Sequence, residues 1–167
     1  MKTLVLCLAA LAGTQGLFAA GKTPMAISAD FKNGSDIPVR YTCRGANTAP
    51  ELTFTNVPAK AKTLLLIVDD PDAPYGVWTH WTIWNIPAAL KTLKRSALPK
   101  GVTEGRGSSG KIGYDGPCPP ARHRYYFRLY ALDGSIDAKA EASSSELMKK
   151  AKGHILAEAQ LMGYFGK

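Results

Sequence analysis

Residues 63–74, TLLLIVDDPDAP, join an uninterrupted apolar run to three aspartates and two prolines. The length and composition of 63–69 predict a central strand that is buried on both faces. Proline fixes its own φ and donates no backbone hydrogen bond, so the chain is expected to leave the sheet at Pro71. The sequence therefore predicts a buried strand that presents carboxylates at one edge of a sheet.

Further short runs with apolar or alternating character surround this strand and are separated by turn residues, as in all-β proteins. The expected strands cover residues 25–28, 39–42, 51–55, 80–86 and 124–132. Residues 98–120 are rich in Gly, Ser and Pro without a period, which predicts a long loop that is functional or partly disordered. Ser143 to Glu146 form a capping box, and the apolar spacing after it predicts a helix over about 144–161. The fold is thus predicted to be mostly β with a C-terminal helix.

The first twenty residues have the layout of a secretory signal peptide, and the remainder is expected to form one domain over 21–167. Lys2 precedes an apolar run over 4–12, and small residues end at Ala20, where we expect cleavage. The apolar run is too short to serve as a membrane span. We therefore expect an exported protein, either periplasmic or secreted.

Two cysteines, Cys43 and Cys118, remain once Cys7 leaves with the signal peptide. In an oxidising compartment they allow one disulfide, and the same residues are compatible with two buried thiols. The sequence leaves both alternatives open.

The formal net charge is +8 over 167 residues, but the basic residues are spread along the chain. A nucleic-acid platform needs a basic block interleaved with aromatic residues, and none is present. The charge is compatible with small anionic partners and, at most, with peripheral contact to an anionic membrane.

Besides the aspartates after the buried strand, polar residues that could form a binding pocket occur in three further stretches. Residues 78–87, WTHWTIWNIP, contain His80; residues 113–120 read GYDGPCPP; and residues 123–127, HRYYF, contain His123 and Tyr125. The imidazoles, the Tyr125 hydroxyl and turn N–H groups can donate to phosphate oxygens. Asp70 and Asp72 flank Pro71 and would point to the same side of an extended chain, where they are expected to share a proton or a cation.

Neighbouring residues are expected to have structural roles. Asp-Pro sequences often build local turns, which favours a structural role for Asp69. Arg124 lies on the opposite face of its strand from His123 and Tyr125, so we expect it to form a structural salt bridge. The tryptophans at 78, 81 and 84 are expected to pack in the core and at the pocket rim.

Taken together, in this order and spacing, these motifs resemble the phosphatidylethanolamine-binding protein family, in particular its bacterial and archaeal Raf-kinase-inhibitor-like branch. The matching stretches are residues 41–43, 49–52, 69–74, 80–81, 85–87, 113–120, 123–125, 154–157 and 161–164. The resemblance runs from about residue 25 to residue 167. It implies a β-sandwich of antiparallel-rich sheets, with a C-terminal α-helix and a small anion-binding cavity at one end.

The resemblance also implies which residues line that cavity, and it implies no catalytic residue, metal or cofactor. The implied ligand-binding residues are Asp70, Asp72, His80, Pro117, His123 and Tyr125. Pro117 and the region of Gly116 would form the rim, and Tyr164 is a candidate lid.

The preferred function is a non-enzymatic binding protein for phosphate or phosphoethanolamine-like head groups, with a protein partner as a further expectation. One alternative is a metal-dependent hydrolase that uses the same His and Asp residues, although no dense metal-ligand spacing such as HExxH is present. A second alternative is a secreted interaction module resembling a protease inhibitor, with residues 98–120 as its contact region. No nucleic-acid partner is expected.

Overall fold

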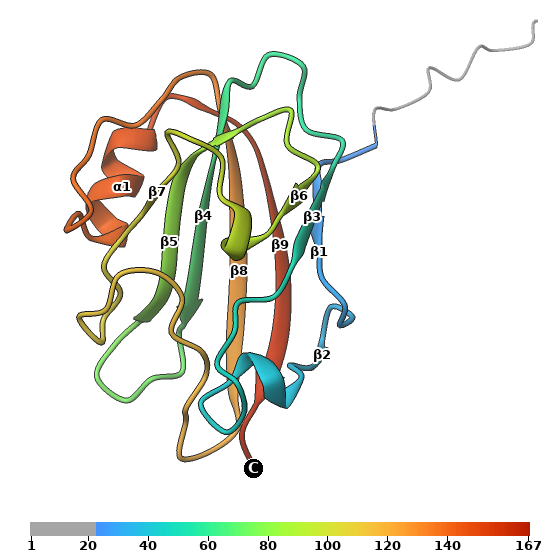
Figure 1. Ribbon diagram of the computed structural model, residues 1–167, viewed down its shortest axis with the longest axis vertical. Helices are drawn as coiled ribbons and strands as arrows, with labels where there is room; N and C mark the ends of the chain where they lie inside the picture. The colour runs from blue at the N-terminus through green and yellow to red at the C-terminus, as the bar shows by residue number, and fades with distance from the viewer. Residues whose placement is uncertain (1–22) are drawn as a thin grey trace, which may run out of the picture.

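Two β-sheets lie face to face in the computed structural model, which describes residues 23–167 (Figure 1). The smaller sheet contains β1 (Ala26–Ser28), β3 (Leu52–Thr55) and β6 (Thr92–Leu93), in that order. The larger sheet has the order β2 (Ser35–Asp36), β9 (Ile155–Phe165), β8 (His123–Leu132), β4 (Thr63–Asp70), β5 (Trp78–Pro87) and β7 (Thr103–Glu104). All neighbouring strands are antiparallel except β2 and β9, which are parallel.

The strand β4 lies between β5 and β8 and is buried on both faces, as the apolar run predicts. Leu64, Leu66 and Val68 point into the core between the two sheets. Leu65 and Ile67 point the other way, toward a smaller cluster beneath the helix α1 (Ser144–Ala151). A continuous apolar sequence is required here because neither face of the strand meets water.

The core between the sheets is built from alternating residues of the long strands. Tyr125 and Phe127 of β8 share one face and are buried with Trp81 and Ile83 of β5. Trp84 lies on the opposite face of β5, within the cluster under α1. The predicted role of Trp81 and Trp84 in core packing is therefore confirmed.

The predicted helix over 144–161 is correct only in its first part. The capping box is present, since the Glu146 N–H donates to Ser143 Oγ at 3.2 Å and the Ser143 N–H donates to Glu146 Oε2 at 2.7 Å. The helix α1 nevertheless ends at Ala151, and Gly153 adopts φ 87°, a conformation that does not continue a helix. The chain then forms β9, whose pairing with β8 along its length overrides the helical spacing of the side chains.

Residues 39–42 are also not a strand. They form a 3₁₀ helix, η1 (Val39–Tyr41), which begins directly after Pro38. The Tyr41 N–H donates to the Pro38 carbonyl, and the Thr42 N–H donates to the Val39 carbonyl. The Thr42 hydroxyl also donates to the Val39 carbonyl, so local hydrogen bonds favour a turn over the predicted strand. The other predicted strands correspond to β1, β3, β4, β5 and β8.

The stretch 98–120 is fixed to the sheet at several points. It contains β7, which pairs with β5, and a bridge between Arg106 and Ile112. A second 3₁₀ helix, η2 (Arg95–Ala97), precedes it. Near its end, Cys118 is joined to Cys43 in a disulfide that spans 75 residues of sequence. Of the two alternatives that the sequence leaves open, the structure therefore has the disulfide.

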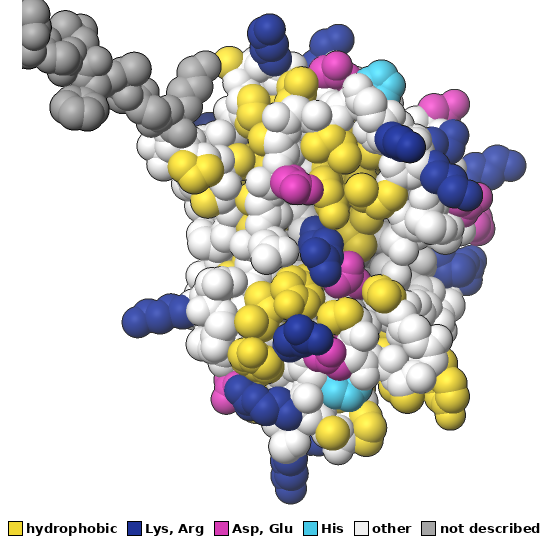
Figure 2. Space-filling view, turned by 180° about the vertical axis from the view of Figure 1, so that it is seen from behind, with side chains coloured by type: hydrophobic (Ala, Val, Ile, Leu, Met, Phe, Trp, Pro, Cys, Tyr) yellow, Lys and Arg dark blue, Asp and Glu magenta, His cyan; other side chains and the backbone are white. Residues whose placement is uncertain are grey.

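The predicted signal peptide over residues 1–20 lies outside the described residues. In residues 23–167 there is no helix of the length and apolar character needed to cross a membrane. Figure 2 shows Lys and Arg side chains scattered over the face opposite to the view of Figure 1, with Asp and Glu between them. That distribution agrees with the absence of a basic block in the sequence.

Replacing Cys43 and Cys118 together by serine is expected to lower the free energy of unfolding by about 4 kcal/mol, because the disulfide closes a long loop in the unfolded chain. Guanidinium unfolding of the variant and the wild type, without reductant, measures the difference. The full-length wild type, denatured without reductant, should show one titratable thiol, that of Cys7. Three titratable thiols would contradict the disulfide.

Candidate functional site

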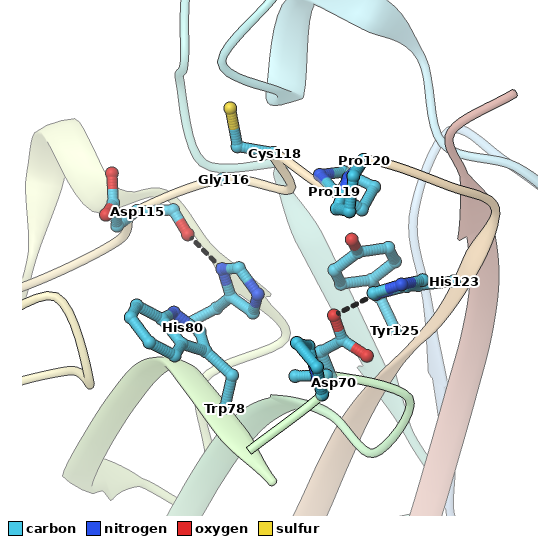
Figure 3. Close-up of a pocket in the computed structure, with 12 residues that line it drawn as sticks. Asp70, Trp78, His80, Asp115, Gly116, Cys118, Pro119, Pro120, His123 and Tyr125 are labelled. Carbon is cyan, nitrogen blue, oxygen red and sulfur yellow. Dashed lines mark hydrogen bonds and ion pairs between the residues drawn. The ribbon is translucent and has the colours of Figure 1, made fainter. Parts of the chain in front are cut away.

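A pocket of about 220 Å³ lies where the C-terminal end of β4 meets the N-terminal ends of β5 and β8 (Figure 3). Antiparallel neighbours place these ends at the same edge of the sheet. A segment of the loop before β8 closes the remaining side. The lining residues are Asp70, Ala73, Pro74, Trp78, His80, Asp115, Gly116, Cys118, Pro119, Pro120, His123 and Tyr125.

Asp70, which is buried, and His123, which is partly buried, form a pair in this pocket. His123 Nδ1 donates to Asp70 Oδ2 at 2.8 Å, and this hydrogen bond becomes an ion pair when the imidazole is protonated. The other carboxylate oxygen, Oδ1, accepts the Asp72 N–H at 2.8 Å and so stabilises the turn at Pro71. Asp70 is therefore both a turn-forming residue and a pocket residue.

His80 is connected to the loop at Asp115 by two hydrogen bonds. Its Nδ1 donates to the Asp115 carbonyl at 2.6 Å, and its own carbonyl accepts the Asp115 N–H at 3.1 Å. Burial lowers the pKa of His80, while the hydrogen bond to Asp115 and the charge of Asp70 oppose that shift. The second ring nitrogen of His80 faces the pocket (Figure 3).

Tyr125 brings an unpaired hydroxyl to the same space. The residue is 1% exposed, and within residues 23–167 its hydroxyl oxygen lies near the Asp70 carboxylate but makes no hydrogen bond of ordinary length and angle. Burial and the charge of nearby Asp70 raise the pKa of Tyr125, so the hydroxyl keeps its proton. A buried polar group without a partner costs about 1–3 kcal/mol, which a bound ligand or water can recover.

The remaining carboxylates near the pocket are paired with cations. Asp69 Oδ2 accepts from Arg128 Nε at 3.0 Å, and Asp115 Oδ1 accepts from Lys111 Nζ at 3.1 Å. Asp72 Oδ2 accepts from Arg124 Nε at 2.9 Å, and this hydrogen bond lowers the pKa of Asp72 to about 2. The salt bridge expected of Arg124 is therefore confirmed. Asp69 is structural as well, but as the partner of Arg128, whereas the turn expected of Asp69 is made by Asp70.

The expectation that Asp70 and Asp72 share a proton or a cation is wrong. Each carboxylate has its own partner, His123 for Asp70 and Arg124 for Asp72. His123 and Arg124 are consecutive in β8 and point to opposite faces, so they separate the two acidic side chains.

The structure brings four of the predicted ligand-binding residues together in the pocket: Asp70, His80, His123 and Tyr125. It does not place Asp72 or Pro117 in the lining. The Pro117 carbonyl accepts the Cys43 N–H at 3.1 Å, while its neighbours Gly116 and Cys118 do line the pocket. The ligand-binding roles of Asp72 and Pro117 stay predictions.

Tyr164, the candidate lid, is also outside the lining of the pocket. Its backbone pairs with Arg124, and its ring lies under the guanidinium of Arg122, with 4.6 Å between Cζ and the ring centroid. The structure therefore does not bring this side chain to the pocket, and its closing role stays a prediction.

Sequence reasoning missed the residues that hold the loop in place. Asn47 Oδ1 accepts the Gly116 N–H at 2.7 Å, and Asn47 Nδ2 donates to Asp115 Oδ1 at 3.3 Å. Gly116 has no room for a side chain, since a Cβ would lie 2.2 Å from the Tyr41 carbonyl oxygen. The glycine and proline content of 113–120 signals a constrained loop, but the sequence contains no signal for its contact with Asn47.

Within residues 23–167, no group of three or more His, Cys, Asp or Glu side chains is arranged to hold a metal ion. The side-chain geometry therefore gives no support to the metal-dependent hydrolase alternative.

Comparison with known proteins connects this arrangement to a family. The family model described as "Phosphatidylethanolamine-binding protein" matches residues 27–166. A UPF0098 protein of Methanothermobacter thermautotrophicus is 48% identical over 141 residues, which cover 81% of this chain and 93% of that protein. A UPF0098 protein of Aquifex aeolicus is 40% identical over 159 residues, covering 89% and 92% of the two chains.

Solved structures lead to the same family. A phosphatidylethanolamine-binding protein homologue from Chlamydia trachomatis has a TM-score of 0.81 at 39% identity, with 86% of this chain and 98% of that chain covered. YbcL of Escherichia coli, described as a new member of the mammalian PEBP family, also has a TM-score of 0.81. Its identity is 29%, and the comparison covers 87% of this chain and 99% of YbcL.

The depressed pKa of His80 predicts a loss of stability in acid that depends on this residue. The folded protein keeps His80 neutral below its ordinary pKa of 6.5, whereas the unfolded chain takes up a proton there. The stabilisation that comes from keeping His80 neutral is therefore fully present above about pH 6.5. Below that pH the free energy of unfolding falls, by up to about 1.4 kcal/mol per pH unit. Urea unfolding between about pH 5 and pH 7.5 measures this change.

His80→Asn is the matched control, because its amide can replace the donor to the Asp115 carbonyl but does not titrate. The pH dependence of its unfolding free energy should be shallower than that of the wild type below about pH 6.5. Equal pH dependence in both proteins would show that burial does not depress the pKa of His80.

Proposed function

The chain belongs to the phosphatidylethanolamine-binding protein family, and we propose that its pocket binds small anionic head groups of the phosphate or phosphoethanolamine kind without transforming them. The observation that carries the proposal is the Tyr125 hydroxyl, a buried donor without a partner within residues 23–167. It lies in the same pocket as the Asp70–His123 pair and the open ring nitrogen of His80.

The size of the pocket favours a head group over a larger ligand. Pockets for drug-sized molecules usually enclose about 300–1,000 Å³. The cavity here is about 220 Å³, so it suits a phosphate group with a short organic substituent. We propose that the acyl chains of a lipid, if present, remain outside.

Each pocket group has a role in this proposal. The Tyr125 hydroxyl donates to a phosphate oxygen, as does His123 Nε2 when the imidazole is charged. The Asp70 carboxylate accepts from an ammonium group of the ligand. Trp78, with Pro119 and Pro120, supplies an apolar mouth for the link between the charged groups, and the indole face suits an ammonium ion.

The composition of the lining supports binding over hydrolysis. None of the residues lining this pocket is Ser, Thr or Lys, and the sulfur of Cys118 is in a disulfide. The hydroxyl in the described lining is that of Tyr125, and its raised pKa makes it a poor nucleophile.

We further propose that the protein is exported. The Cys43–Cys118 disulfide supports this location, because such bonds persist in oxidising compartments outside the cytosol.

A second candidate function is docking to a protein partner, with or without an anion. It is favoured by the loop between β4 and β5, where Tyr75 is 101% exposed and Val77 is 63% exposed beside the pocket mouth. Exposed apolar side chains of this kind often mark interaction sites. Binding of a partner that survives both His80→Ala and His123→Ala would favour this function over the anion pocket.

Tyr125→Phe is expected to weaken phosphoethanolamine binding about fivefold to tenfold, the effect of one lost hydrogen bond. Isothermal titration calorimetry measures the dissociation constant. Stability should not fall, because the variant removes a buried hydroxyl that has no partner in the described structure.

Tyr130→Phe is the matched control, since this residue is on the same strand but the opposite face from Tyr125 and does not line the pocket. Its affinity for phosphoethanolamine should equal that of the wild type. An unchanged affinity in Tyr125→Phe would remove the hydroxyl from the site, and absence of binding to the wild type would refute the proposed function.

A further inference from the structure

We propose that the pocket selects anions that carry an ionisable proton of their own, such as the monoanion of a phosphomonoester, and that His80 is the residue that recognises this proton. The inference rests on the proposed anion-binding function and specifies the chemical class of the ligand.

The hydrogen-bond direction at His80 is the first step. A backbone carbonyl can only accept, so the 2.6 Å contact with the Asp115 carbonyl requires the proton of the neutral ring on Nδ1. The other nitrogen, Nε2, then presents a lone pair to the pocket (Figure 3). Within residues 23–167, no protein group donates a hydrogen bond to it. A ligand that fills the pocket must therefore supply a donor at this position.

The charges around His80 are the second step. Asp69 and Asp70 face it from β4, Asp115 from the loop, and Tyr125 from β8, with ring centroids of His80 and Tyr125 5.3 Å apart. Arg128 neutralises Asp69 and Lys111 neutralises Asp115, but only an imidazole, that of His123, pairs with Asp70. The described lining contains neither Lys nor Arg. A dianion would thus meet a carboxylate without a permanent cation in the lining to balance it.

Burial of His80 is consistent with both steps. It lowers the pKa of the imidazole, so the neutral ring with an accepting Nε2 is the form present near neutral pH. A hydrogen phosphate monoester supplies an O–H to Nε2 and takes the Tyr125 O–H on another oxygen. The complex then holds one proton between Nε2 and the ligand, and a dianionic ligand has to take this proton from the solvent.

Methyl phosphate and methyl sulfate provide the test, since their monoanions have similar size and shape and differ by one ionisable proton. Calorimetric titration of the full chain near pH 5.5, where the phosphomonoester is mostly a monoanion (second pKa about 6), compares them at equal charge. Methyl phosphate should bind about tenfold or more tightly, because sulfate would place an acceptor against the lone pair of Nε2. Near pH 8, titrations in two buffers of different ionisation enthalpy should show uptake of about one proton for each methyl phosphate bound.

His80→Asn removes the acceptor while its amide can still donate to Asp115. In this variant the affinity ratio of the two probes should fall toward one, and the proton uptake should fall toward zero. If the variant does not fold, the comparison of methyl phosphate with methyl sulfate on the wild-type protein is sufficient to test the inference.

Equal affinity of the wild type for the two probes, without proton uptake near pH 8, would overturn this inference and leave the proposed anion pocket intact. Absence of binding by either probe, or by phosphoethanolamine, would overturn the anion pocket and this inference with it.

Discussion

Because both faces of β4 are covered, the two carboxylates at its C-terminal end are removed from water with it, and each needs a partner. Both partners come from β8: Arg128 for Asp69 and His123 for Asp70. The register between β4 and β8 pairs Asp69 with Tyr126, so β8 continues beyond the last paired residue of β4. The pocket occupies this overhang, and its position follows from how the buried strand ends.

The three aspartates of residues 69–72, DDPD, have three different surroundings. Asp69 forms an ion pair with Arg128, Asp70 faces the pocket, and Asp72 forms an ion pair with Arg124 outside the pocket. Successive side chains of β8 point to opposite faces, so His123 and Arg124 lie on different sides of the sheet. Each can therefore pair with a different aspartate at or just beyond the end of β4. One carboxylate, that of Asp70, remains in the pocket, and its partner is an imidazole rather than a Lys or Arg side chain.

The sequence alone predicts those strands in which burial determines the spacing of the apolar residues. The apolar run of β4 and the alternation in β8 have few other interpretations. That Asp70, His80, His123 and Tyr125 share one pocket was implied by the family resemblance that the spaced motifs carry, and the structure brings the four together. Residues 155–162 satisfy helical and strand spacing equally well, and only the open edge of β8 decides between them. The contact between His80 and the Asp115 carbonyl could not be predicted, because every residue has a backbone carbonyl and its direction depends on the folded loop.

The disulfide between Cys43 and Cys118 connects the pocket to the redox chemistry of its surroundings. Cys118 belongs to the pocket wall, and the adjacent Pro117 carbonyl accepts the N–H of Cys43, so the bond attaches the wall to the segment that follows η1. The same wall carries the Asp115 carbonyl that sets the tautomer of His80. Reduction would free the chain near residue 118 and loosen the support of that carbonyl. The disulfide therefore supports, from three residues away, the loop whose carbonyl fixes the tautomer of His80.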